Sequence, residues 1–567
     1  MDPRSAANIL KQIAAFLELA GESTFKVRAY EQAARSVAGL ETDDLGTLDK
    51  SGALASTAGV GKATLGVLRD LIATGESSYL EQLRRDTPSG LLDLLQVPGL
   101  ATEKIHLLRD AIQVDSIDSL EHAARSGELA KVKGFGPKTV ARILKGVEFF
   151  RVNGSRTLYH HAVQRAAPLL AAVRAHPHVV RAEIGGTLRR HCETVGNIVV
   201  VAACAHDARA VAASFTRAPG VQQVTRGDTA SPCITYADGT RLDLHCVNEG
   251  EFSHAWWRET GSPDHVRAVT DIIARVNPDV RMEQVHDEAE LYALAGLPFI
   301  PAEMREEGYE LEMAASGRMP VLLVPADIRG CLHCHSTYSD GKVSIAELAE
   351  AARVRGWSYI GITDHSQSAF YASGMSVDQV LRQHDEIDAL NAAQQDVRIL
   401  KGIEADILSD GLVDYGSDIL GRFDFVVGSI HSRFAMDRTT MTARVLRALD
   451  DPHLTILGHP TGRLLLSREG YPIDMDLVLE KAGAMGVAVE LNADPKRLDL
   501  DWRLLPRAKA LGVPINIGPD AHSINGLDNM NIGVGIARKA GIEAGDVLNT
   551  GTADDILEFA RARRSNS

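Results

Sequence analysis

Histidines and carboxylates recur through residues 327–567, most of them directly after a short apolar run. Seven such runs end in a side chain that can bind a metal ion, for example ITDH at 362–365 and LGH at 457–459. The carboxyl ends of parallel strands in a barrel all face the same side, so these side chains are expected to meet. With Asp340, the predicted ligands and catalytic residues are His333, His335, Asp340, His365, Glu404, His431, His459, Asp520 and His522.

The spacing of these residues fits chelation. His333 and His335 are two apart, so both project from one face of a strand, and Asp520 and His522 repeat this arrangement. Asp340 lies in a Ser-Asp-Gly loop that permits a tight turn. A mixture of imidazole and carboxylate suits Mn²⁺, Zn²⁺ or Fe²⁺ better than Mg²⁺, which prefers oxygen ligands. The sequence therefore predicts two to three such ions.

The elements that must position these side chains alternate between strand-like apolar runs and amphipathic helices such as 344–354. This alternation predicts a βα barrel. Arg433 and Arg463 follow ligand-bearing strand ends and are candidates to bind a phosphate, although a surface position is equally typical of them. Cys331 and Cys334 are predicted to point to opposite faces of a strand, which excludes joint metal binding.

The first 150 residues combine a helical pattern with three glycine-containing turns, at 58–62, 98–101 and 133–138, each followed by an amphipathic helix. Such a hairpin lets backbone N–H groups and a helix N-terminus approach a phosphate, which predicts DNA binding without sequence preference. Ordinary helix caps are the alternative, and the middle copy lacks the second glycine. The candidate DNA-binding residues are Gly59, Gly61, Gly99, Gly134, Gly136 and Lys138.

Residues 185–199, GGTLRRHCETVGNIV, resemble the signature of the family X DNA polymerases. The resemblance implies a nucleotidyltransferase-like palm in which arginines hold phosphates and an Asp-x-Asp strand shares two Mg²⁺ with a third carboxylate. Arg189 and Arg190 match the arginines and Asp243 the third carboxylate, but Asn197 and Val199 replace the other two acids. Because Mg²⁺ depends on anionic oxygens, loss of the polymerase activity and of its Mg²⁺ site is expected.

Over its whole length the chain resembles bacterial family X polymerases that carry a C-terminal PHP (polymerase and histidinol phosphatase) domain. The resemblance implies a distorted (β/α)7 PHP barrel with three metals, and each family ligand has a counterpart among the nine residues above. The expected architecture is multidomain, α+β and α/β. It comprises a helix–hairpin–helix region at 1–152, a palm and thumb at 153–317, a linker at 318–326 and the PHP domain at 327–567.

Composition sets limits on the partners. The net charge is −15, with −2 in the first 150 residues and −9 in residues 331–567, so any DNA contact must be local. No apolar run approaches the ~18 residues that a membrane span needs, and the N-terminus lacks a signal-peptide pattern. A cytoplasmic monomer that binds gapped, nicked or 3′-ended DNA is expected.

These features favour a DNA-repair nuclease, a 3′–5′ exonuclease with possible cleavage at abasic sites, whose palm serves to hold DNA. Three alternatives stay open: a working gap-filling polymerase with exonuclease activity, a small-molecule phosphatase that acts on substrates like histidinol phosphate, and a DNA-binding scaffold. The nine intact ligands argue against the last.

Overall fold

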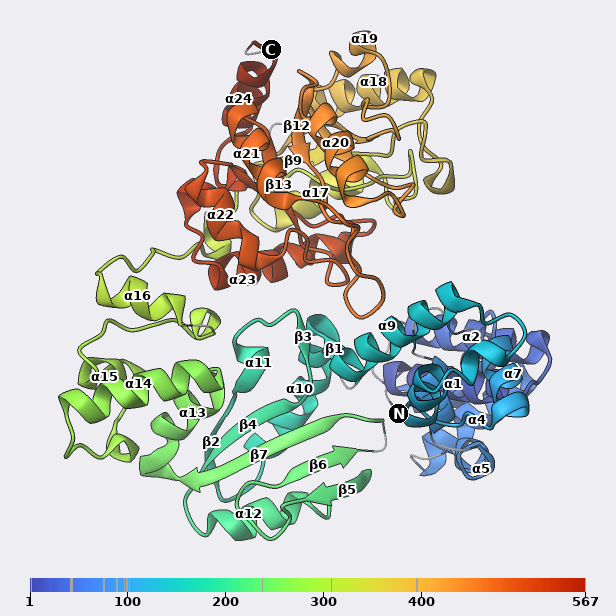
Figure 1. Ribbon diagram of the computed structural model, residues 1–567, viewed down its shortest axis with the longest axis vertical. Helices are drawn as coiled ribbons and strands as arrows, with labels where there is room; N and C mark the ends of the chain where they lie inside the picture. Colours follow the sequence, from blue (N-terminus) through green and yellow to red (C-terminus); the bar gives the residue numbers. More distant parts are fainter. Residues whose placement is uncertain are drawn as a thin grey trace. The chain divides into compact units, whose positions relative to one another are not determined.

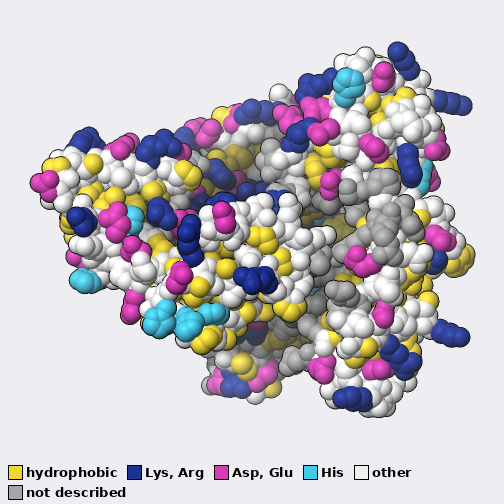
Figure 2. Space-filling model, turned by 90° about the horizontal axis from the view of Figure 1, so that it is seen from below, with side chains coloured by type: hydrophobic (Ala, Val, Ile, Leu, Met, Phe, Trp, Pro, Cys, Tyr) yellow, Lys and Arg dark blue, Asp and Glu magenta, His cyan; other side chains and the backbone are white. Residues whose placement is uncertain are grey.

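The computed structural model of the chain describes all residues except 2, 41–43, 75–76, 88–89, 96, 98–99, 101, 155, 237, 307, 394–395 and 566–567. The chain divides into two compact units, residues 1–155 and residues 156–567. Among the described residues, no helix is both long and apolar enough to cross a membrane. On the face drawn in Figure 2, basic and acidic side chains are interspersed.

The first unit is helical, as the glycine-punctuated pattern predicts. Two separate apolar cores hold it together, one centred on α1 and α2 and the other on α7, α8 and α9. Short 3-10 turns, η1 (Leu54–Ser56) and η2 (Leu129–Lys131), precede the first and third glycine turns. The helices are α1 (Pro3–Leu19), α2 (Thr24–Ala38), α3 (Leu45–Lys50), α4 (Lys62–Thr74), α5 (Ser78–Asp86), α6 (Gly90–Leu95), α7 (Thr102–Ile112), α8 (Ile117–Arg125) and α9 (Pro137–Asn153).

The second unit opens with a five-stranded sheet in the order β2-β4-β7-β6-β5 (Figure 1). Its central strands β4 and β7 run parallel, and their register sets Val199 opposite Asp243. The strands and helices of this palm are β1 (Thr157–Leu158), α10 (Tyr159–Arg174), β2 (Val179–Ile184), α11 (Gly186–Arg189), β3 (Thr194–Val195), β4 (Ile198–Cys204), α12 (Ala208–Phe215), β5 (Val221–Thr225), β6 (Cys233–Tyr236) and β7 (Arg241–Asn248).

A small helical layer follows the sheet and packs around Trp257 and Tyr292. Its helices are α13 (Phe252–Thr260), α14 (Pro263–Val276), α15 (Glu288–Leu294) and α16 (Tyr309–Ala315). The segment 318–326, predicted to be a linker, is bound to the C-terminal part. Leu323 is fully buried and its N–H donates to the carbonyl of Ile542 at 3.0 Å.

Seven parallel strands in the order β14-β13-β12-β11-β10-β9-β8 form the expected barrel, which is confirmed as nearly closed. A β-bridge between Cys334 and Ala521 joins its two edges. The strands are β8 (Gly330–Cys331), β9 (Tyr359–Ile362), β10 (Arg398–Asp406), β11 (Phe425–Ser429), β12 (Leu454–Leu457), β13 (Ala488–Asn492) and β14 (Ile515–Gly518). Around them lie α17 (Ile345–Val354), α18 (Val377–Ala393), α19 (Ser417–Leu420), α20 (Arg438–Ala448), α21 (Met475–Met485), α22 (Leu505–Ala510), α23 (Asn529–Lys539) and α24 (Ala553–Ser565).

One local expectation is wrong. Strand β8 ends at Cys331, so the alternation of faces does not continue to Cys334. Both thiols are buried, and a hydrogen bond between them, with burial, raises the pKa of the Cys334 thiol. The two cysteines therefore share one side of the segment.

Candidate metal centre and DNA-contacting segments

Glu404, at the C-terminal half of β10, lies at the centre of the histidine cluster. Its side chain is almost fully buried and both carboxylate oxygens face imidazole nitrogens. These nitrogens lie 3.0–3.6 Å from the Glu404 oxygens and belong to His333, His335, His365, His431 and His459. A two-oxygen ligand in this position can bridge neighbouring ions.

Two further carboxylates complete the cluster. Asp520 Oδ1 lies 3.6 Å from His333 Nε2 and 3.2 Å from His335 Nε2. Asp340 Oδ1 lies 3.2 Å from His522 Nε2. The structure thus brings together all nine residues that the sequence nominated, although they come from separate strand ends and one loop.

The ring nitrogens of the cluster test whether divalent ions fit. His333 Nε2, both ring nitrogens of His335, and His365 Nδ1 are buried without a hydrogen-bond partner. Buried polar atoms are rarely left unpaired, so unpaired nitrogens that converge on carboxylates fit the binding of divalent cations. Asp520 also adopts a φ of 49°, a strained conformation for a non-glycine residue that is common at functional sites.

The charges of the cluster are strongly coupled. Burial favours the neutral acid, but the imidazoles of His431 and His365 outweigh it and hold the pKa of Glu404 well below its usual range. Burial lowers the pKa of His365 to about 4, so this ring is neutral and able to coordinate. For His522, burial is outweighed by Asp340 and Asp520, which raise its pKa to about 9.

Two carboxylates that the sequence analysis did not nominate orient the ligands. Glu490 Oε1 lies 2.5 Å from His333 Nδ1, and its other oxygen accepts the backbone N–H of His459 at 2.7 Å. Asp406 Oδ1 lies 2.7 Å from His431 Nδ1. A carboxylate on the far nitrogen fixes the ring and its tautomer for metal binding. The i, i+2 spacing from Glu404 to Asp406 on one strand was the available signal for Asp406.

The candidate phosphate-binding arginines divide into two groups. Arg497, a further arginine that the sequence analysis did not nominate, places its Nε 3.7 Å from Asp520 Oδ2. Of the four nominated arginines, Arg433 lines a pocket beside His431. The other three have carboxylate partners: Arg463 pairs with Glu193 and Asp501, Arg189 with Glu288, and Arg190 with Glu306. Arg463, Arg189 and Arg190 thus have protein partners in this structure, and phosphate binding by them stays a prediction.

In the palm, the remaining acid of the signature is fully engaged. Asn197 Nδ2 donates to Asp243 Oδ2 at 2.7 Å, and Arg226 donates to Oδ1 at 2.9 Å. The side chain of Val199 fills the space beside Gly186, where an added Cβ would come within 2.7 Å of it. Asp243 is therefore paired with the guanidinium of Arg226 and bonded to the amide of Asn197.

The first and third glycine turns share one geometry. Gly59 and Gly134 have φ of 86° and 95°, which favours glycine, whereas Gly61 and Gly136 have ordinary φ and open space beside them. Gly136 is the N-cap residue of α9, and Lys138 is exposed in the first turn of that helix. Gly99 of the middle turn lies outside the described residues.

Comparison with known proteins accounts for this combination of parts. The PHP domain family matches residues 332–492, and a helix-hairpin-helix domain family matches residues 1–77. The chain is 37% identical over 574 residues to the DNA polymerase/3′-5′ exonuclease PolX of Bacillus subtilis (strain 168), covering 99% of this chain and 100% of that protein. The chain belongs to the bacterial family X DNA polymerases. The resemblance noted from the sequence is thereby confirmed.

The C-terminal part of this family X protein also has separate relatives. It is 29% identical over 243 residues to a "Probable phosphatase" of Thermoanaerobacter sp. (strain X514), covering 41% of this chain and 94% of that protein. A "Probable phosphatase" of Caldanaerobacter subterraneus subsp. tengcongensis is 27% identical over 244 residues, with 41% and 91% covered. Asp520 and His522 lie beyond the residues that the PHP family matches, yet they join the same cluster.

Proposed function

We propose that this chain is a cytoplasmic DNA-repair nuclease, a 3′–5′ exonuclease that also cleaves beside abasic sites, and that it acts as a monomer. Eight residues that form three overlapping groups of metal-binding side chains carry the proposal, together with His459, whose Nε2 lies 3.0 Å from Glu404 Oε1. Membership in the family X polymerases and the helix–hairpin–helix region support DNA as the substrate.

The residues of the cluster fit two to three Mn²⁺, Zn²⁺ or Fe²⁺ ions. When bound, such ions lower the pKa of a water molecule and offset the negative charge on phosphoryl oxygens. Glu404 lies between the imidazoles that would hold neighbouring ions, and Glu490 and Asp406 keep the rings of His333 and His431 in place.

The scissile phosphate needs cationic groups that are not already neutralised by protein carboxylates. Arg433 meets this condition among the described residues around the pocket beside His431. A guanidinium there can hold two phosphate oxygens and align the phosphodiester with the cluster.

For the palm, we propose that it binds DNA but does not incorporate nucleotides. Asn197 and Val199 offer no carboxylate, and Asp243 is bonded to Asn197 and Arg226. Mg²⁺ is held in proteins chiefly by anionic oxygens, so this arrangement opposes its binding.

Two other functions have specific support. The name of the Bacillus subtilis relative includes a DNA polymerase activity, which favours an active gap-filling polymerase with exonuclease activity. The phosphatase relatives of the C-terminal part favour a small-molecule phosphatase that acts on substrates like histidinol phosphate. Incorporation of nucleotides would support the polymerase over the proposed nuclease. Cleavage of phosphomonoesters without cleavage of DNA would support the phosphatase.

One assay distinguishes the three functions. A 3′-labelled and a 5′-labelled primer-template are incubated with protein and Mn²⁺, with and without the four deoxynucleotides. We expect shortening of the primer from its 3′ end in both conditions, and none with the double variant His333→Ala/His335→Ala. Extension by that double variant would support the polymerase, and cleavage of histidinol phosphate without cleavage of DNA would support the phosphatase.

Metal content gives an independent check. After reconstitution with Mn²⁺, elemental analysis is expected to find more than one ion per chain, because three groups of ligands share the cluster. Less than one ion per chain would contradict a multinuclear site.

A further inference from the structure

A short loop between the ligand His365 and helix α18 presents two aromatic side chains. Its 3-10 turn η7 (Phe370–Ala372) leaves Phe370 86% and Tyr371 68% exposed, whereas Ala372 in the same turn is 1% exposed. Large aromatic side chains are usually buried, so their exposure beside a metal cluster indicates a binding role.

This loop is firmly anchored. The N–H of Met375 donates to the carbonyl of His365 at 2.9 Å, and the Tyr415 hydroxyl donates to the carbonyl of Met375. The backbone at Gly374 approaches Ser366 so closely that an added Cβ would lie 1.9 Å from its carbonyl oxygen. Because both ends of the loop are fixed, the turn holds Tyr371 in one place.

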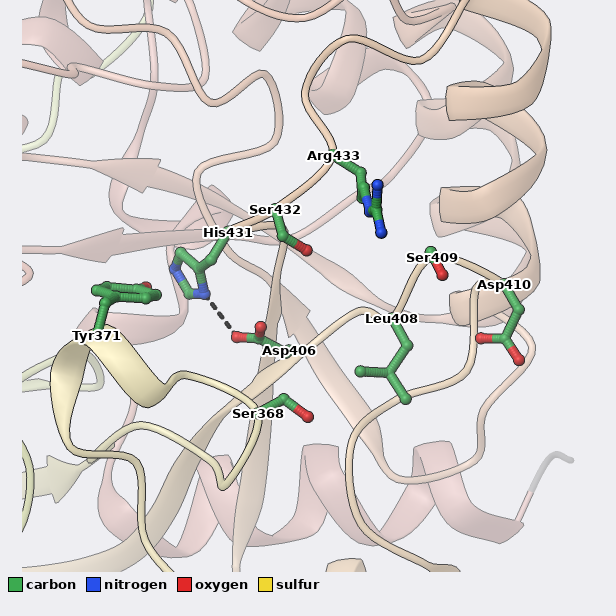
Figure 3. Close-up of a pocket in the computed structure, with 9 residues that line it drawn as sticks. All are labelled: Ser368, Tyr371, Asp406, Leu408, Ser409, Asp410, His431, Ser432 and Arg433. Carbon is green, nitrogen blue, oxygen red and sulfur yellow. Dashed lines mark hydrogen bonds and ion pairs between the residues drawn. The ribbon is translucent and has the colours of Figure 1, made fainter.

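Tyr371 stands at the edge of the metal cluster. Its ring centroid lies 5.9 Å from the ring of His365 and 5.9 Å from that of His431. Figure 3 shows its ring beside His431, and both side chains line the pocket of about 390 Å³ that Arg433 also lines. A group bound in this pocket would therefore adjoin both the metal ligands and an aromatic face.

The lining of the pocket indicates what that group is. Arg433 is its one basic side chain, and the lining also holds the carboxylates of Asp406 and Asp410, so the pocket does not suit several phosphates. The remaining side chains are Leu408, three serines, Tyr371 and His431. Hydroxyls, an apolar group and an aromatic face suit a flat, neutral and polar ligand such as a nucleobase.

We propose that Tyr371 stacks on the base of the nucleotide next to the scissile phosphate, which Arg433 holds against the metal cluster. The inference rests on the proposed nuclease function and specifies its substrate as an unpaired 3′ end. A base inside a duplex stacks on its neighbours and cannot turn its face to Tyr371 without being unstacked.

The test compares two single-stranded oligonucleotides that differ only at the 3′-terminal nucleotide. One strand carries a normal nucleotide there, and the other carries a tetrahydrofuran analogue that lacks the base. With Mn²⁺-loaded protein, Tyr371→Leu is expected to raise KM for the strand with the base by about ten-fold, since a stacked base contributes this much to binding. KM for the abasic strand is expected to stay unchanged.

Two control variants make the result specific to the ring. Tyr371→Phe keeps the aromatic face and is expected to retain the wild-type preference for the base. Phe370→Leu removes the other exposed aromatic of the same turn, which does not line the pocket, and is also expected to retain it. Tyr371→Phe behaving like Tyr371→Leu would assign the effect to the hydroxyl and overturn the proposal.

The inference and the proposed function fail in different ways. Base stacking would be overturned if the wild-type protein degraded both strands equally well and Tyr371→Leu either had no effect or slowed both strands alike. The proposed nuclease function would then still stand. Wild-type protein that degrades neither strand would overturn the proposed function, and this inference with it.

Discussion

At the scale of single residues, the cluster depends on carboxylates that hold its histidines in place. Glu490 is fully buried. One of its oxygens is hydrogen-bonded to His333 Nδ1, and the other accepts the backbone N–H of His459. It therefore positions two ligands on different strands. Its charge also favours the ring form of His333 whose Nε2 is free to coordinate.

Replacing Glu490 by Gln keeps its shape and removes its charge. We expect Glu490→Gln to weaken Mn²⁺ binding by about 10–100-fold, the usual effect of removing such an outer carboxylate. Titration of metal-free protein with Mn²⁺ measures this. Glu480→Gln, which removes an exposed carboxylate paired with Arg507, is the matched control and is expected to bind as the wild type does. Equal affinities for both variants would contradict the positioning role.

The palm offers a second prediction for individual residues. Restoring the acids by Asn197→Asp and Val199→Asp leaves Arg226 on Asp243, where it competes with a metal ion. We therefore expect the double variant to extend a primer poorly and the triple variant with Arg226→Ala to extend it at least about ten-fold faster, because an ion pair of this kind opposes metal binding.

These palm variants are assayed in the His333→Ala/His335→Ala background, so that the product is not degraded. The control is the same background with the native palm, which is expected to show no extension in Mg²⁺. Template-directed extension by that control, abolished by Asp243→Ala, would show that one carboxylate suffices to hold the catalytic ions.

At the scale of elements, the first and third glycine turns each contain one glycine that the backbone conformation requires and one that it does not. Gly59 and Gly134 need their glycine for a positive φ, so replacing them strains the fold whether or not DNA is bound. Gly61 and Gly136 have no such need, and each has open space beside it. Only the second pair tests DNA contact without first disturbing the hairpin.

We expect Gly61→Val/Gly136→Val to weaken DNA binding about equally for all sequences. The slope of log affinity against log salt concentration is expected to fall by about one for each phosphate contact that is lost. Fluorescence anisotropy at several salt concentrations measures both effects. Gly66→Ala, within helix α4 and also with open space, is the control and is expected to change neither. Unchanged binding by the double variant would place DNA holding outside these turns.

The barrel was predictable from the sequence because its strands are short apolar runs, six of which contain or lead directly into a predicted ligand. His333 and His335 both approach Asp520 as their spacing predicts, but they lie beyond the end of β8, so strand alternation is not the reason for it. The partners of the arginines could not be predicted, since Arg463 and Glu193 are 270 positions apart and nothing local marks them as a pair. The Cys331–Cys334 prediction failed because β8 ends earlier than its apolar run.

At the scale of the whole molecule, the palm and the barrel belong to one compact unit. Helix α23 of the barrel lies against the palm so closely that an added Cβ on Gly535 would come within 2.1 Å of His191 Nδ1. Lys539 at the end of this helix is 1% exposed, pairs with Glu306, and donates to the carbonyl of Arg190 at 3.2 Å. The signature loop of the palm is thus tied to the domain that carries the metal cluster.

Lys539 should therefore matter to both parts. Lys539→Met removes one of the two cations that pair with Glu306, leaving Arg190, and removes the donor for a buried carbonyl. It is expected to lower the free energy of unfolding by about 2–3 kcal/mol. In the full chain this corresponds to a fall of roughly 3 °C in the melting temperature of the second unit. Lys481→Met, which breaks an exposed pair with Asp450, is the matched control and is expected to change stability by less than about 0.5 kcal/mol.

Loading the barrel with metal shows whether Lys539 couples the stability of the palm to that of the barrel or only stabilises the contact between them. Trp256 and Trp257 lie in helix α13 of the palm layer, far along the chain from every ligand of the cluster. In the wild type, Mn²⁺ bound in the barrel is expected to raise the melting temperature of a palm-side signal, because ligand binding stabilises whatever unfolds with its site. In Lys539→Met this gain in the palm is expected to shrink while the gain in the barrel persists. An equal metal-induced gain in both parts of the variant would mean that Lys539 stabilises the contact without coupling the two folds.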